Sequence, residues 1–134
     1  MLVLTCRIGG VIRLGQGVRI TLAARMGQRV AVSLVAPLDQ PVMFDRACLQ
    51  PVALSDGLCS YLFSLQGIRS FHVGGLQVGL WMPGEVTPEA GDYQDYIHIG
   101  VLGAGPLRLA YEQDDDSEIP VVTATAAATA CLLN

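Results

Sequence analysis

The sequence predicts an all-β fold built from two similar halves, and three observations lead to this prediction. Apolar and polar residues alternate along short segments, which is typical of strands with one buried face. Glycines and prolines separate these segments at short intervals. The order of segments in the first 46 residues returns after residue 60, which indicates an internal repeat. We therefore expect two five-stranded units that intertwine, because one such unit cannot bury its own apolar face.

The first repeat is expected over residues 1–46 as five short strands. The two clearest strands are 18–25 and 29–35, and Val30, Val32 and Leu34 share one face of the second. Between them a hairpin turn is predicted at Gly27-Gln28, because glycine accepts a positive φ. Earlier turns are expected at Gly9-Gly10 and Gly15-Gln16-Gly17, and Pro37 ends the fourth strand before the fifth begins at Pro41.

The second repeat is expected over residues 60–112, after a linker over residues 47–59 in which Pro51 stops any helix. Its predicted strands lie at 61–65, 69–73, 76–82, 96–102 and 107–111. A tail is expected over residues 113–134. The acidic run at 112–118 is interpreted as solvated and mobile. The alanine-rich end that follows is compatible with a short helix or an added edge strand.

Charge is divided unevenly along a chain that contains no lysine. Residues 1–46 hold six arginines against two aspartates, a net charge of +4, whereas residues 47–134 hold two arginines against ten acids, a net charge of −8. A nucleic-acid-binding protein needs a basic surface, and only the first half can supply one. The alternative interpretation is that the opposite signs help the two halves associate.

Targeting signals and catalytic motifs are not apparent in the sequence. No stretch reaches the roughly 20 apolar residues of a membrane helix, and the N-terminus is interpreted as a strand rather than a signal peptide. We therefore expect a cytoplasmic protein without a membrane partner. No nucleotide-binding or hydrolase motif accompanies His72 or His98, which are interpreted as sheet residues. We expect no enzyme activity.

Metal and cofactor sites are not expected either. The cysteines are irregularly spaced, lack a CxxC pair and are expected to be reduced thiols; they are Cys6, Cys48, Cys59 and Cys131. Four acids crowd one loop that also holds two prolines, and a solvated loop is favoured over a calcium site there. These acids are Glu85, Glu89, Asp92 and Asp95.

Residues 1–44 resemble the carbon storage regulator (CsrA/RsmA) family without a gap. The shared features are the opening MLVLTCR strand, the turn glycines Gly9, Gly15 and Gly27, and the Ala36-Pro37 pair. The resemblance implies a bacterial post-transcriptional regulator that binds GGA-bearing loops of RNA. It also implies an obligate dimer of intertwined five-stranded chains, whose first and last strands pair with the partner's middle strands. In this chain, the two repeats are expected to replace the two subunits as a single-chain pseudo-dimer.

The RNA-binding residues that the resemblance implies are only partly kept. From the first strand they are Leu4, Thr5 and Arg7, with Cys6 in place of an arginine. From the fifth strand they are Val42 and Phe44, and Tyr111 takes the place of Phe44 in the second repeat. Phe44 and Tyr111 stand where the family has its main RNA-binding arginine, whose planar fork of donors they cannot replace. They can either stack on bases or pack in the sheet.

Two functions are consistent with this pattern. The first is a divergent post-transcriptional regulator that binds mRNA or small RNA, with the usual GGA recognition weakened or lost. The alternative is an interaction module, without RNA binding, that sequesters or modulates a family member or that member's protein partner. Trp81 lies opposite the expected core face, so it is either exposed on a partner surface or buried under the C-terminal tail.

Overall fold

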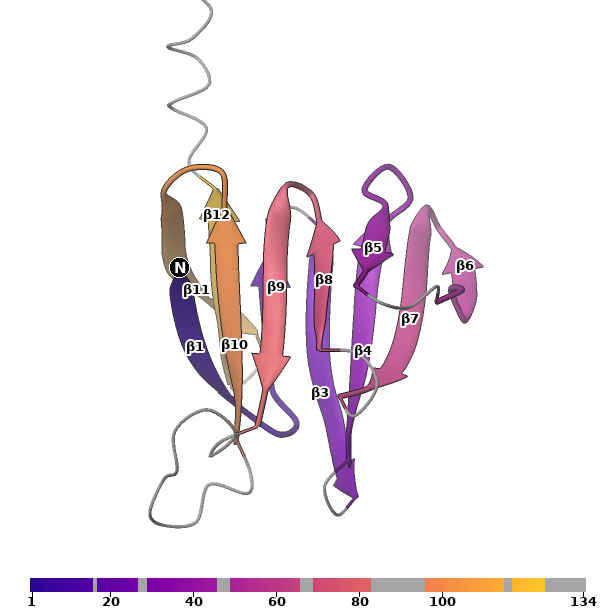
Figure 1. Cartoon of the computed structure of the whole chain (residues 1–134), viewed down its shortest axis with the longest axis horizontal. Helices are drawn as coiled ribbons and strands as arrows, with labels where there is room; N and C mark the ends of the chain where they lie inside the picture. Colours follow the sequence, from indigo (N-terminus) through magenta and orange to yellow (C-terminus); the bar gives the residue numbers. More distant parts are fainter. Residues whose placement is uncertain are drawn as a thin grey trace, which may run out of the picture.

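The computed structural model describes residues 1–15, 17–26, 29–45, 49–65, 69–82, 96–114 and 117–124. These residues form strands and turns without any helix, which confirms the all-β prediction (Figure 1). The strands are β1 (Leu2–Arg7), β2 (Val11–Leu14), β3 (Val18–Met26), β4 (Arg29–Pro37), β5 (Val42–Phe44), β6 (Ala53–Ser55), β7 (Leu58–Ser64), β8 (Ser70–Val73), β9 (Leu76–Trp81), β10 (Tyr96–Gly103), β11 (Leu107–Asp114) and β12 (Ser117–Ala124).

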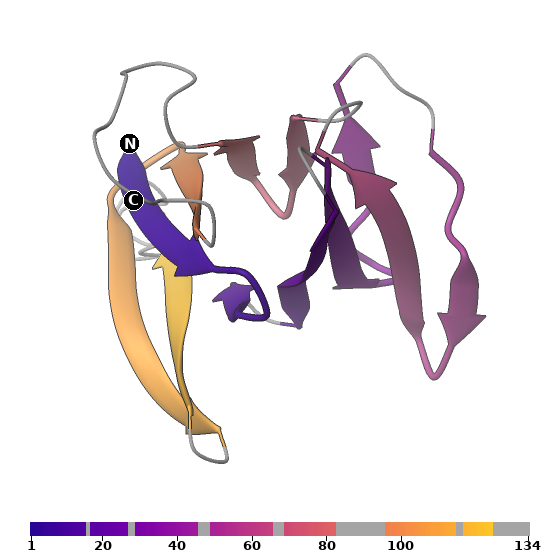
Figure 2. The same ribbon diagram turned by 90° about the horizontal axis from the view of Figure 1, so that it is seen from below.

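The strands form two sheets that face each other as two layers (Figure 2). Sheet A has the order β1-β10-β9-β8-β5, and sheet B has the order β11-β12-β2-β3-β4-β7-β6. In sheet A, the front portion of the chain (residues 1–45) supplies both edge strands, and the back portion (residues 49–124) supplies the three middle ones. In sheet B, the back portion supplies strands on both sides of the front portion's β2–β4. Each sheet therefore needs both portions of the chain.

The core lies between the sheets because alternate residues of each strand point inward. Along β4, every second side chain from Val30 to Ala36 is fully buried. Strands β9 and β10 repeat this pattern, with Val78 and Ile99 among the buried side chains. Burial of these aliphatic side chains contributes on the order of 2 kcal/mol each. The two sheets thus provide for each other the apolar cover that neither portion of the chain could supply alone.

Tight turns fix the register of the hairpins. Gly74-Gly75 joins β8 to β9 as a two-residue loop, with φ of +56° and +78°. Two positive φ angles in a two-residue hairpin loop favour glycine at both positions. A further constraint applies at Gly17 before β3, because an added Cβ would lie 2.7 Å from Cγ of Pro37. These glycines lie at turns that the sequence predicted.

The structure differs from the expected boundaries in the linker. Strand β6 lies inside the segment 47–59, and β7 begins there, at Leu58. Asp56-Gly57 joins the two strands with φ of +54° and +76°. Asp-Gly is among the preferred sequences for this kind of hairpin turn. The hairpin therefore had a local sequence signal, whereas the linker prediction rested on Pro51.

The second difference lies in the expected tail. Residues 117–124 form β12, which pairs parallel with β2 and antiparallel with β11. The strand expected over 107–111 is β11. The resemblance implies a place for it beside a middle strand of the first repeat, but it forms the outer edge of sheet B, with β12 between it and β2. The acidic run supplies the ends of this hairpin as far as it is described, and β12 is the added strand. Its valines suit a position between two strands better than the sequence around Tyr111 does.

Within the described ranges, no helix has the length and apolar character needed to span a membrane.

Candidate nucleic-acid interface

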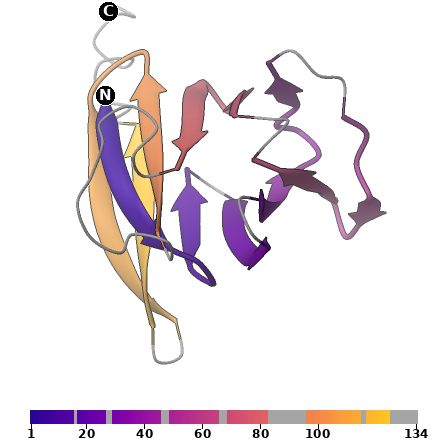
Figure 3. The same ribbon diagram turned by 60° about the horizontal axis from the view of Figure 1, so that its bottom comes forward.

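The expected RNA-binding residues of the first and fifth strands lie at two ends of the sandwich. At one end β1 runs beside β11, and Figures 1, 2 and 3 agree on this arrangement. At the other end β5 lies against β7, where Phe44 contacts the rings of Tyr61 and Phe63. Each end therefore combines a strand of the front portion with a strand of the back portion.

The β5/β7 end is closed by an aromatic cluster. The ring of Phe44 lies 5.3 Å from the rings of both Tyr61 and Phe63, and 5.8 Å from that of Phe71. The first two contacts have the edge-to-face geometry that favours aromatic pairs. Val42 also packs against the core. Phe44 and Val42 therefore hold the sheets together at this end, and the packing alternative describes Phe44 better than a free stacking platform.

The residues of β1 fall into two groups, those that point toward the core and those that point outward. Leu4 packs against the core, and Cys6 is 8% exposed. Burial raises the pKa of the Cys6 thiol to about 11, so this side chain stays neutral in its apolar surroundings. Thr5 and Arg7 point outward and are exposed. Only these two of the three predicted first-strand residues are presented to solvent.

The outward residues of β1 continue into a row across sheet A. Thr5, His98 and Trp81 are cross-strand neighbours on β1, β10 and β9. Thr5 Oγ1 lies 3.0 Å from Nδ1 of His98, and the ring of His98 lies 5.8 Å from that of Trp81. The guanidinium of Arg7 lies 5.7 Å from the ring centroid of Tyr96, a cation–π distance. The row thus offers aromatic rings, hydrogen-bonding groups and one cation.

A strip without side chains lies under Trp81. Gly79 and Gly100 face each other on β9 and β10. A Cβ at Gly100 would come within 3.0 Å of the Trp81 ring, and also within 2.9 Å of Sδ of Met1. The indole therefore lies along the sheet surface over the glycines, which leaves Trp81 half-buried. It is neither fully exposed nor part of the core between the sheets, and the segment 125–134 lies outside the described residues.

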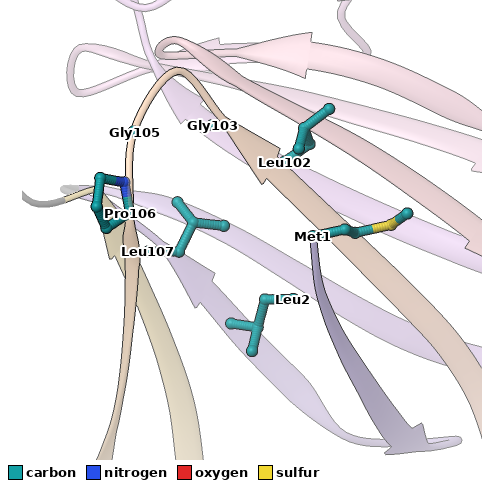
Figure 4. A pocket seen from close by; sticks show the side chains of 7 residues that line it. All are labelled: Met1, Leu2, Leu102, Gly103, Gly105, Pro106 and Leu107. Carbon is teal, nitrogen blue, oxygen red and sulfur yellow. The ribbon is translucent and has the colours of Figure 1, made fainter.

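The β1/β11 end has a shallow pocket lined by apolar side chains and glycines. Its volume is about 250 Å³, and it is lined by Met1, Leu2, Leu102, Gly103, Gly105, Pro106 and Leu107 (Figure 4). Leu2 and Leu107 reach it from β1 and β11. Tyr111 lies further along β11 and is 59% exposed.

The arginines of the first half do not gather on one face. Arg7 lies on the outer face of sheet A, whereas Arg13 and Arg19 are neighbours on the outer face of sheet B. Arg13 forms an ion pair with Glu112 of β11. Arg19, Arg25 and Arg29 also have interaction partners. The basic surface considered from the sequence is therefore divided between two faces of the sandwich.

No group of three or more potential metal-ligating side chains occurs in the part of the chain that the structure describes. His72 Nδ1 lies 3.5 Å from Asp45, and the hydroxyl of Ser70 donates to the same carboxylate. Cys6 and Cys59 are free thiols. Cys48, Cys131, Glu85, Glu89, Asp92 and Asp95 fall outside the described residues.

Sequence reasoning singled out Trp81 but missed the row it belongs to. Alternation along each strand places Trp81 and His98 opposite the core. Their proximity to each other and to Thr5 depends on pairing between strands far apart in the chain, which no local pattern states.

Comparison with protein-family models, curated proteins and solved structures finds no match for this chain. The resemblance to the carbon storage regulator family therefore stays a prediction that rests on the residues of the sequence.

Proposed function

We propose that this protein is a divergent, single-chain relative of the carbon storage regulators that acts in the bacterial cytoplasm by binding RNA. The observation that carries the proposal is the interleaving of strands. In sheet A, β1 and β5 flank β8, β9 and β10. This is the pairing that the resemblance implies for the first and last strands of one subunit with the middle strands of its partner. The single chain contains both portions, so it needs no second molecule for this arrangement.

The usual GGA recognition is expected to be weak or lost. Phe44 occupies the main arginine's place and is engaged by three aromatic rings. Cys6 replaces another arginine, and its side chain is in the core. Each lost cationic contact to a phosphate removes a term that dominates RNA affinity at physiological salt. Arg7 and Thr5 remain available on the outer face of sheet A.

A titration with labelled RNA tests this proposal. The probe is a hairpin with GGA in its loop, followed by fluorescence anisotropy at near-physiological salt, and the control is the same hairpin with the loop changed to CCA. We expect dissociation constants of about 10–100 µM, in the range of non-specific binding, with less than a threefold preference for GGA. Absence of binding to either hairpin at the highest protein concentration in this range would contradict the proposal.

A second candidate function, the binding of a protein partner, is supported by the edge of sheet B that β6 forms. Strand β6 ends the sheet, so in the described part of the chain no strand pairs with its outer edge. Val52 and Leu54 are 64% and 63% exposed here, and Leu58 and Leu62 of β7 are also exposed. An edge strand with exposed apolar side chains is suited to receive a strand of another protein. Such a partner would be a family member or its regulator.

Affinity capture from a bacterial extract, with and without RNase, separates the two functions. A protein partner bound at β6 should survive RNase and should be lost in Leu54→Lys. The control Leu102→Lys changes an exposed leucine on the other sheet. If RNA is the only molecule recovered, the interaction-module function is wrong.

A further inference from the structure

The strongest unassigned feature is the outer face of sheet A around Trp81. We propose that this face is a stacking platform for the bases of single-stranded RNA. The RNA would then lie across β1, β10 and β9 instead of along the β1/β11 edge. The inference rests on the proposed RNA-binding function and names the surface and the form of RNA that this function uses.

The glycine strip supports a platform because it has a cost in stability. Glycine within a strand is destabilising by a fraction of a kilocalorie per mole relative to alanine, and it often marks a place where another group approaches closely. Here two glycines face each other, Gly79 and Gly100, and the Trp81 indole occupies the space above them. The end of the indole therefore lies close to the sheet over Gly100, where Sδ of Met1 also lies.

Two polar neighbours of Trp81, His98 and Thr5, offer hydrogen-bonding groups to a nucleobase. His98 lies beside the indole and is held by Thr5, so a ring with hydrogen-bonding capacity is fixed next to the stacking surface. Tyr96 lies two residues before His98 on the same face of β10, which is a separation of about 7 Å along the strand. Trp81 therefore provides the place for one unstacked base, and Tyr96, whose ring the Arg7 guanidinium covers, lies nearby on the same face. Duplex RNA, whose bases are already stacked, would not fit this surface.

The single cation of this row predicts how the binding depends on salt. Arg7 is the arginine that lies against the platform, over Tyr96. One phosphate contact gives a slope of about −0.7 in a plot of log affinity against log salt concentration for single-stranded nucleic acid. Stacking itself depends little on salt. We therefore expect a slope near −1 or shallower, in contrast to the steep dependence of a binding site lined with arginines.

The chain contains one tryptophan, so its fluorescence reports on this surface alone. The experiment titrates the full-length protein with an unstructured RNA octamer and records tryptophan fluorescence and RNA anisotropy in the same samples. We expect saturable quenching whose midpoint agrees with the anisotropy curve. Duplex RNA of the same length should produce no quenching.

Three variants locate the site. Trp81→Ala should lower the affinity for the octamer by about tenfold, since stacking on an aromatic residue is worth roughly 1–3 kcal/mol per base. Tyr111→Ala is the matched control, because it removes an exposed aromatic ring from the β1/β11 edge, and it should leave the affinity unchanged. Trp81→Phe keeps a smaller ring and should fall between wild type and Trp81→Ala, which shows that stacking rather than folding is affected.

The results distinguish failure of the stacking platform from failure of the proposed RNA-binding function. If anisotropy shows binding while tryptophan fluorescence does not change, or if Tyr111→Ala rather than Trp81→Ala weakens binding, RNA binds elsewhere and only the platform is wrong. If anisotropy shows no binding, the proposed function fails and the platform with it. If the fluorescence responds to a purified protein partner but to no RNA, the surface belongs to the alternative function, and the inference is overturned.

Discussion

The two ends of the sandwich each combine a strand of the front portion with a strand of the back portion, but they have very different surfaces. At the β5/β7 end, Phe44 is enclosed by three aromatic rings and the sheets are joined by packing. At the β1 end, Thr5 and Arg7 face outward and continue into a row with His98, Trp81 and Tyr96. The β5/β7 end is closed by aromatic packing, whereas the β1 end has polar and aromatic side chains on the outer face of sheet A.

This difference shows what a single chain permits. In a symmetric homodimer, one sequence builds both ends, so any substitution appears twice. In the proposed single-chain arrangement, a residue such as Phe44 affects one end only. Stability at the β5/β7 end can then vary independently of the residues on the outer face at the β1 end. The comparison predicts that variants at the two ends will separate stability from binding.

The largest expected effect is on stability at the closed end. Phe44→Ala removes a half-buried ring that contacts Tyr61, Phe63 and Phe71, and it should lower the free energy of unfolding by about 2–3 kcal/mol. RNA affinity measured under folded conditions should not change. Urea denaturation followed by circular dichroism measures the loss. The matched change Tyr111→Ala, at an exposed ring, should alter stability by less than about 0.5 kcal/mol.

Phe44→Arg tests whether the β5/β7 end binds RNA. If position 44 were still an RNA-binding site, restoring the arginine of the resembling family, together with Cys6→Arg, would increase RNA affinity. In this structure both positions pack against apolar residues, and an unpaired charge there is costly. We expect the double variant to unfold at a lower temperature without a gain in affinity. A gain in affinity in the single variant Phe44→Arg, with unchanged melting temperature, would show that the β5/β7 end binds RNA.

A smaller effect is expected from pH at the inner side of β1. The pKa of Cys6 is raised by burial from 9.0 to about 11, so the folded state holds its proton more tightly than the unfolded chain does. The stabilisation from this thiol is complete below pH 9 and is lost as the pH rises towards 11. The total is at most about 3 kcal/mol. Comparison of unfolding curves for wild type and Cys6→Ala between pH 8 and pH 11 isolates this contribution. An equal pH dependence in both proteins would contradict the burial of Cys6.

The smallest effect concerns the one cation of the row on sheet A. Arg7→Ala should weaken RNA binding severalfold and reduce the salt slope by about 0.7, with little change in stability because the side chain is exposed. Arg108→Ala on β11 removes the same charge from sheet B and serves as the control. If both variants weaken binding equally, the effect comes from net charge, and the β1 end has no special role.

Much of the fold could be predicted from local sequence patterns. Alternation identified the strands that carry Val32, Val78 and Ile99, and Gly74-Gly75 identified a hairpin, because periodicity and turn geometry are properties of short segments. The row of Thr5, His98 and Trp81 could not be predicted, since it depends on the register between β1, β10 and β9. The place of β12 beside β2 could not be predicted either, because the segment before it is acidic and its own composition suits more than one structure.

Interlocking of the front and back portions of this chain through shared sheets can be tested by nuclear Overhauser contacts in the isotope-labelled full-length protein. We expect cross-strand contacts between Leu4 and Ile99 and between Leu34 and Tyr61, which are opposite each other in the two sheets. If β1 and β4 instead show cross-strand contacts only with strands of residues 1–45, the two portions fold separately, and the interlocked arrangement is wrong.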